Sequence, residues 1–299
     1  MNDTIAHLDI APAAKTPFQI TVAQFRRHKL AVVSLILLVI FVVLSLLADQ
    51  IVPYDPNDID PRAANVTRGF PQPPTAEHVL GTDDLNRDLL SRALFGMRVS
   101  LAVGFFFFFF AISLGVAVGT LSGYAGGAVD NLLMRMVDVF LSVPSFILFL
   151  TLNSLLPPSI WTVVIILGAF SWMDVARLVR AEMLALKERE FVIAARSLGA
   201  TPLRLVLSHV LPNALAPILV AATLSIPAAI LSESTLSFLG LGVPPPNASL
   251  GNMLQDAKAW LTNAWWMWLT PGVIISLIVL AFNFVGDGLR DAFDPTLRR

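Results

Sequence analysis

Long uninterrupted runs of apolar residues limit what this chain can fold into more than any other feature of its sequence. A helix of about 20 mostly apolar residues crosses the hydrocarbon core of a bilayer. Six runs approach or reach this length, at about residues 30–48, 99–121, 139–156, 160–173, 213–231 and 265–285. A transmembrane β-barrel would instead show alternating segments of about ten residues. We therefore predict an all-α membrane protein with six transmembrane helices, the fourth ending where Asp174 and Arg177 interrupt the apolar run.

Composition and charge narrow the class of protein further. Hydrophobic residues make up 56% of the 299 residues and charged residues only 14%, against about 25% charged residues in soluble domains. The net charge of −1 gives no basic footprint, so we expect no nucleic-acid partner, and the apolar runs imply contact with membrane lipid. Because the chain has no cysteine and its four histidines are scattered, we predict no metal site.

The distribution of Lys and Arg predicts the orientation in the membrane. Most of the 20 basic residues fall on the same side as the amino terminus, and the exceptions are Arg62, Arg68, Arg87, Arg92, Arg98 and Lys258. Under the positive-inside rule, both termini are then cytoplasmic. The predicted organisation is a cytoplasmic segment 1–29, a first transmembrane anchor helix 30–48, an extracytoplasmic loop 49–98, a core of five helices 99–289 and a cytoplasmic tail 290–299.

A partly polar stretch between the fourth and fifth runs predicts two short helices joined by a tight turn. Residues 190–198 favour a helix, and Gly199 follows where a left-handed C-cap would cost any other residue about 1–2 kcal/mol. Thr201 is a suitable N-cap, and Pro202 suits the first helical position. The apolar stripe expected on the second helix comprises Leu203, Val206, Leu207, Val210 and Leu211.

This stretch resembles the cytoplasmic loop in permease subunits of bacterial ABC importers, where two alanines, a glycine and a Leu-Pro pair recur at fixed spacing. The matching residues are Ala194, Ala195, Gly199, Leu211 and Pro212. In that pattern an acidic residue precedes the alanines, and here Ile193 stands in its place. Glu190 lies one helical turn earlier and offers a carboxylate on the same face.

Three further segments are similar to dipeptide and oligopeptide permeases of the C-subunit type. The segment GTDDLNRDLLSRALFG, residues 81–96, matches the signature ahead of the second span, with Asn86 where glycine is usual. Residues 236–254 and 282–295 resemble the last outer loop and the carboxy terminus of the same proteins. Together with the cytoplasmic loop, these matches cover nearly the whole chain from Arg26 onward in the right order.

The resemblance implies the type I ABC importer permease fold and a transport role without catalysis in this chain. Such a subunit forms half of the translocation pathway of an ATP-driven importer in the bacterial inner membrane, here for di- or oligopeptides. The implied partners are a second homologous permease subunit, two cytoplasmic ATPase subunits that bind ATP and Mg²⁺, and an extracytoplasmic substrate-binding protein. No lysine follows a glycine, so the chain lacks the phosphate-binding Gly-x-x-x-x-Gly-Lys motif, and we expect no cofactor on it.

The resemblance also assigns candidate site residues. The loop that couples to the ATPase spans about residues 177–212, and its candidate residues are Glu190, Ala194, Ala195, Arg196, Gly199, Leu211 and Pro212. Glu233 and Ser234 lie just past the outer end of the fifth run. Since ionisable groups near membrane depth usually face a cavity or a partner, these two are candidates for lining the pathway.

An ion- or proton-coupled secondary transporter is the alternative function. Such a protein is expected to show internal repeats and charges near the membrane midplane, and the two halves of this chain share no repeat. A membrane-embedded enzyme is a further alternative, but it would need a convergent group of acids, bases or nucleophiles, and none is apparent.

Overall fold

The computed structural model describes residues 17–61 and 70–294, and this part of the chain is mostly helical, with an irregular segment over 52–60 and 70–88. Five of the described helices are long and apolar enough to cross a membrane, and a bent pair of shorter helices makes six candidate spans if it is counted as one. The five are α2 (Lys29–Leu46), α5 (Leu89–Ala125), α8 (Ile160–Leu186), α11 (Leu211–Phe238) and α13 (Trp265–Phe293), and the pair is α6 (Gly127–Leu141) with α7 (Ser145–Leu155). The prediction of an all-α membrane protein is confirmed.

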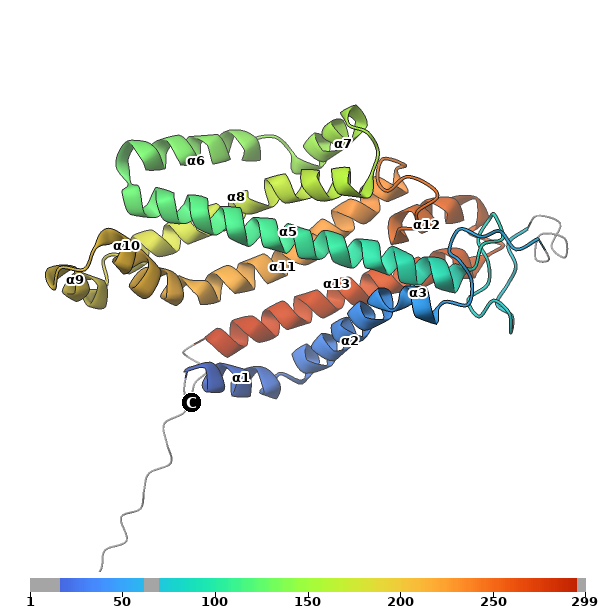
Figure 1. The fold of residues 1–299 in the computed structure, drawn as a ribbon, viewed down its shortest axis with the longest axis horizontal. Helices are drawn as coiled ribbons and strands as arrows, with labels where there is room; N and C mark the ends of the chain where they lie inside the picture. The colour runs from blue at the N-terminus through green and yellow to red at the C-terminus, as the bar shows by residue number, and fades with distance from the viewer. Residues whose placement is uncertain (1–16, 62–69, 295–299) are drawn as a thin grey trace, which may run out of the picture.

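The long helices lie side by side in one elongated bundle (Figure 1). The α9–α10 loop, α1 and the carboxy-terminal end of α13 lie at one end of this bundle, and α3 and α12 lie at the other. The shorter helices are α1 (Pro17–Arg27), α3 (Ala48–Ile51), α9 (Glu190–Ser197), α10 (Pro202–Leu205) and α12 (Leu250–Asp256). A π-helix, Val206–Val210, connects α10 to α11, and a 3-10 turn, Ala257–Trp260, follows α12.

The third span is broken, so the prediction of one helix over residues 139–156 is wrong. Helices α6 and α7 meet at an angle of 80°. Pro144 lies at the break with an extended ψ of 116°. Proline cannot donate a backbone hydrogen bond and disfavours helical geometry in the residue before it, so the helix ends ahead of Pro144 and restarts at Ser145.

The fourth span does not end near residue 173 as predicted, because α8 continues to Leu186. The two arginines on its extension pair with carboxylates of α6. Arg177 contacts Asp138, and Arg180 binds Asp130 through Nε and Nη2 at 2.5 and 2.6 Å. These ion pairs balance the charges of the two arginines on α8 and join α6 to α8.

The second span begins at Leu89, ten residues before the predicted start, and it packs closely on α8. Three glycines at intervals of four, Gly115, Gly119 and Gly123, face α8. A Cβ atom at Gly119 would lie 2.5 Å from the carbonyl oxygen of Ala176 and 2.6 Å from Cβ of Val179. Small residues at this spacing let two membrane helices approach until their backbones nearly touch.

We expect Gly119→Val to destabilise the bundle, because the added methyl groups must push α5 and α8 apart. Overpacking of this kind costs about 1–3 kcal/mol. The measurement is the thermal unfolding midpoint of the purified protein in detergent. Gly272→Ala on α13 is the control, since a Cβ there meets nothing within 4 Å. Equal midpoints for both variants would show that the close contact is not required.

Candidate coupling site

The loop between α8 and α11 is a pair of short helices joined at Gly199, as predicted. Gly199 has a φ of +84°, in the left-handed region. Its N–H donates to the carbonyl of Arg196 at 3.0 Å, and the N–H of Ala200 donates to the carbonyl of Ala195 at 3.1 Å. These two bonds form a complete Schellman motif, which satisfies the last carbonyls of α9 and fixes the direction of the chain.

The second helix begins where the sequence places it, although its cap differs in detail. Thr201 occupies the N-cap position with extended backbone, and Pro202 is the first residue of α10. The Thr201 side chain makes no capping hydrogen bond, so the expected side-chain cap is wrong. The fixed φ of Pro202 is then the local feature that favours helix initiation here.

The apolar stripe predicted for the second helix is partly wrong. Val206 and Val210 are buried as expected, but Leu203 and Leu207 are 68% and 54% exposed, and Leu205 is buried instead. The prediction assumed a regular α-helix, whereas residues 206–210 form a π-helix in which the Leu211 N–H donates to the carbonyl of Val206. A π turn contains one extra residue, so positions on either side of it no longer share one face.

The loop has a buried side and an open side. Val192 of α9 is 1% exposed and joins Leu205 and Val210 in a cluster with Val179 and Met183 of α8. On the open side the exposed side chains are Glu190, Phe191, Ile193, Arg196, Leu198, Leu203 and Arg204. Leu198 is 90% exposed, which is unusual for a leucine outside the hydrocarbon region.

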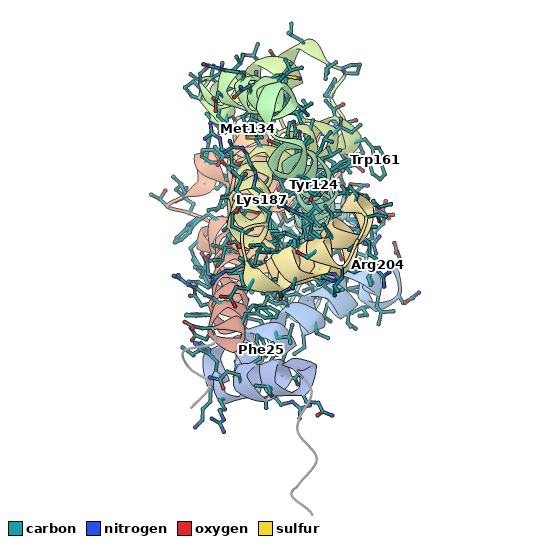
Figure 2. The ribbon with its side chains drawn as sticks, turned by 90° about the vertical axis from the view of Figure 1, so that its left-hand side faces the viewer. Phe25, Tyr124, Met134, Trp161, Lys187 and Arg204 are labelled. Atoms are coloured by element: carbon teal, nitrogen blue, oxygen red, sulfur yellow. The ribbon has the colours of Figure 1, made fainter. Side chains whose placement is uncertain are left out.

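Figure 2 looks onto this end of the bundle and labels side chains from several elements around the loop. Tyr124 lies in the last turn of α5, Lys187 follows α8, Arg204 belongs to α10, and Phe25 belongs to α1. The structure therefore brings the predicted loop residues together at one end, beside the ends of α1, α5 and α8. Leu211 and Pro212 begin α11 at the same end.

Glu233 and Ser234 lie near the opposite end of α11, and both side chains face the interior of the chain. Glu233 is 0% exposed. Its carboxylate accepts hydrogen bonds from Ser100 of α5 at 3.2 Å and from Ser237 at 2.8 Å. Ser234 also donates to it from the neighbouring position, at 3.4 Å. Glu233 thus ties α11 to α5, and its role in the pathway stays a prediction.

Residues 75–88, directly ahead of α5, fold into a compact segment that we call the cap, and its backbone explains the asparagine at position 86. Asn86 has a φ of 60°. Asparagine tolerates this left-handed region better than other non-glycine residues, which accounts for asparagine at a position where glycine is usual. The Asp83 carboxylate accepts a hydrogen bond from Nε of Arg87 at 2.7 Å and lies 3.0 Å from Nε of Arg92. Asp88 is the N-cap of α5, and its carboxylate accepts a hydrogen bond from the N–H of Ser91.

His78 links two parts of this cap. Its Nδ1 lies 2.9 Å from Oδ1 of Asp88, and its Nε2 lies 3.2 Å from Oδ2 of Asp60. Burial lowers the pKa of His78, but the hydrogen bonds and charges of Asp88 and Asp60 outweigh burial, so the pKa lies above its ordinary 6.5. A neutral imidazole donates from only one nitrogen, and both contacts are satisfied together only by the imidazolium.

Two family models match the chain over separate ranges. Residues 115–299 match the binding-protein-dependent transport system inner membrane component. Residues 16–74 match the N-terminal TM domain of oligopeptide transport permease C. The first match covers more than half of the chain and includes the whole coupling loop.

The chain belongs to the family of binding-protein-dependent transport permeases. It is therefore a multi-pass inner membrane subunit of an ABC transporter and not itself an enzyme. Permeases of this family work with ATPase and binding-protein components, which sets aside the secondary transporter. Among the described residues, no group of three or more His, Asp or Glu side chains could hold a metal ion.

Relatives of this permease match its sequence over nearly its full length. The dipeptide transport system permease protein DppC of Haemophilus influenzae is 38% identical over 299 residues, covering 100% of both chains. The oligopeptide transport system permease protein OppC of Bacillus subtilis is 40% identical over 92% of this chain and 88% of its own. An inward-facing structure of the MetNI methionine ABC transporter has the same fold, with a TM-score of 0.56, 24% identity and coverage of 69% of this chain and 98% of that chain.

Two features of this permease were missed from the sequence. The spacing of apolar residues does not reveal the π turn before Leu211, although Pro212 lies close to its end. The contacts of His78 join residues 18 and 10 positions away and depend on how the cap folds. The only local signal there was Asp88, three residues before Ser91, which is the spacing of a helix cap.

We expect the cap of this permease to loosen as the pH rises. A histidine whose folded pKa is raised contributes stability that is present below its ordinary pKa and lost as the pH climbs through the folded value. Hydrogen exchange of residues 75–88, corrected for intrinsic rates, should show protection that falls as the pH is raised above the ordinary histidine pKa of 6.5. His78→Asn should remove this dependence.

His209→Asn is the control for the cap experiment, because His209 lies in the π-helix at the other end of the bundle. Asp60→Asn should shift the loss of protection to lower pH, since it removes one of the two carboxylates that raise the pKa of His78. Protection that is independent of pH in the unsubstituted chain would show that the imidazolium does not stabilise the cap.

Proposed function

We propose that this permease forms half of the translocation pathway of an ATP-driven importer for di- or oligopeptides. The observation that carries the proposal is the α9–α10 loop, a rigid helix pair at the base of α8 and α11 with an open apolar face. The peptide substrate is supported by relatives named as dipeptide and oligopeptide permeases that match over 92–100% of this chain. In such a system the binding protein makes the first selection of substrate.

The proposed assembly contains a second homologous permease, two ATPase subunits that hold ATP and Mg²⁺, and an extracytoplasmic binding protein. We place both termini and the α9–α10 loop in the cytoplasm. The excess of Lys and Arg on that side supports this orientation. The bundle also supports it, because α1, the end of α13 and the loop lie together (Figure 1).

The exposed face of the loop suits a groove on the ATPase surface. Leu198 and Leu203 present apolar area next to Arg196 and Arg204. Glu190 is exposed in the first turn of α9, three residues before exposed Ile193. Residues three apart share a helix face. Glu190 therefore supplies a carboxylate for an ion pair next to Ile193, the position at which the family pattern has an acidic residue.

Movement of the ATPase reaches the spans through the buried face of the same loop. Val192, Val206 and Val210 pack against Val179 and Met183 of α8. A close-packed interior is nearly incompressible, so a displaced loop moves α8 and α11 with it. ATP is then hydrolysed on the partner, while this chain converts the partner's closure into a change of the pathway.

We expect Gly199→Val to weaken attachment of the ATPase while the chain still inserts into the membrane. The substitution strains a left-handed residue by about 1–2 kcal/mol, and 1.4 kcal/mol corresponds to about tenfold in an equilibrium constant. The measurement is the amount of ATPase that co-purifies with tagged permease from solubilised membranes. We expect about tenfold less than with the unsubstituted chain.

Gly127→Val is the matched control. Gly127 also has a positive φ, +54°, and a Cβ there likewise meets nothing within 4 Å, but it lies at the start of α6. Equal loss in both variants would point to general misfolding. Normal recovery of the ATPase with Gly199→Val would contradict the coupling role of the loop.

A further inference from the structure

The Leu211-Pro212 pair lies where the hydrogen-bonding pattern changes between α10 and α11. The Leu211 N–H donates to the carbonyl of Val206, five residues back instead of four. Pro212 has no N–H, and in a regular α-helix its ring would clash with the carbonyl of Ser208 four residues back. The wider π turn is the arrangement that avoids this clash.

Proline alone does not produce such a turn in this chain. Pro217 and Pro227 also lie inside α11, which remains α-helical around both. Pro212 differs because the next residue, Asn213, donates from Nδ2 to the carbonyl of His209 at 2.5 Å. The side chains of Ile218 and Ala228, which follow the other two prolines, carry no donor. Pro212 and Asn213 therefore act together at the π turn.

The π turn is held on one side and open on the other. Val206 and Val210 are 7% and 1% exposed within the cluster that includes Val192 of α9. Leu207 and Pro212 are exposed on the opposite side. Because its side chains pack on one side only, the turn is free to pivot about the buried Val206 and Val210 while these two residues keep their contacts.

We propose that the π turn Val206–Val210, maintained by Pro212, is the joint at which movement of the coupling loop becomes rotation of α11. The proposal rests on the coupling role of the loop. Pro212 keeps the Leu211 N–H on the carbonyl of Val206, because the α register would bring its ring against the carbonyl of Ser208. Helices bend at π turns, so α10 and α11 pivot here about the edge that Val206 and Val210 anchor.

Deleting Ser208 tests the joint directly. The deletion leaves Leu211 four positions after Val206, so their existing hydrogen bond becomes an α-helical one and the extra residue is gone. Ser208 is exposed, which keeps the buried cluster intact. Pro212→Ala is the second variant, because it removes the ring that excludes the α register. Pro217→Ala is the matched control within the same helix.

The measurement uses the complete importer with its ATPases, reconstituted in liposomes. The chain has no cysteine, so Thr201→Cys and Ser232→Cys introduce two unique sites for spin labels, one on each side of the joint. We expect ATP with vanadate to change the distance between the labels in the unsubstituted joint. The Ser208 deletion and Pro212→Ala should abolish that change and lower uptake of labelled trialanine by about tenfold, whereas Pro217→Ala should leave both intact.

The outcomes separate the joint from the coupling role of the loop. Normal co-purification of the ATPases together with an unaltered distance change in both variants would overturn the joint and leave the coupling role standing. Failure of the unsubstituted chain to recover ATPases would overturn the coupling role and the joint with it. Loss of the distance change in Pro217→Ala as well would also overturn the proposal, because the effect would then belong to any proline of α11.

Discussion

The fold depends on one constraint, which is that backbone N–H and C=O groups inside a bilayer must find partners within the protein. Helices meet this requirement segment by segment, and the described chain is accordingly helical across each of its spans. Departures from the α-helix occur where another group takes over the bonding. The Schellman motif at Gly199 and the Asn213 side chain at the π turn each supply a bond that the regular helix no longer makes.

Close packing and paired charges then decide how the helices are arranged. The glycines of α5 bring it against α8, and Arg180 of α8 holds Asp130 of α6. Glu233 performs the corresponding task at the other end, where its buried carboxylate accepts hydrogen bonds from Ser100 of α5 and from Ser237 of its own helix. These polar groups join elements, whereas the α9–α10 loop leaves charged and apolar side chains exposed side by side.

Much of this arrangement could be predicted from the sequence, because hydropathy and local turn chemistry determine it. The apolar runs give the spans, and Gly199 and Pro202 mark the two short helices because their backbone requirements are local. The extension of α8 past Arg177 and the exposure of Leu207 could not be predicted in this way. The first depends on the pairing of Arg177 with Asp138, and the second on the extra residue of the π turn. The setting of His78 likewise required the folded cap.

The length of α5 has a mechanical consequence. Its 37 residues, Leu89–Ala125, form a rod of about 55 Å, well beyond the roughly 30 Å of hydrocarbon. One end is capped by Asp88, the partner of His78, and the other lies at the same end of the bundle as the α9–α10 loop (Figure 1). A tilt of about 5° would carry each end of such a rod through a few ångström relative to the other. The cap and the end of the bundle that carries the α9–α10 loop are therefore joined by one continuous helix, so a tilt of α5 displaces both together.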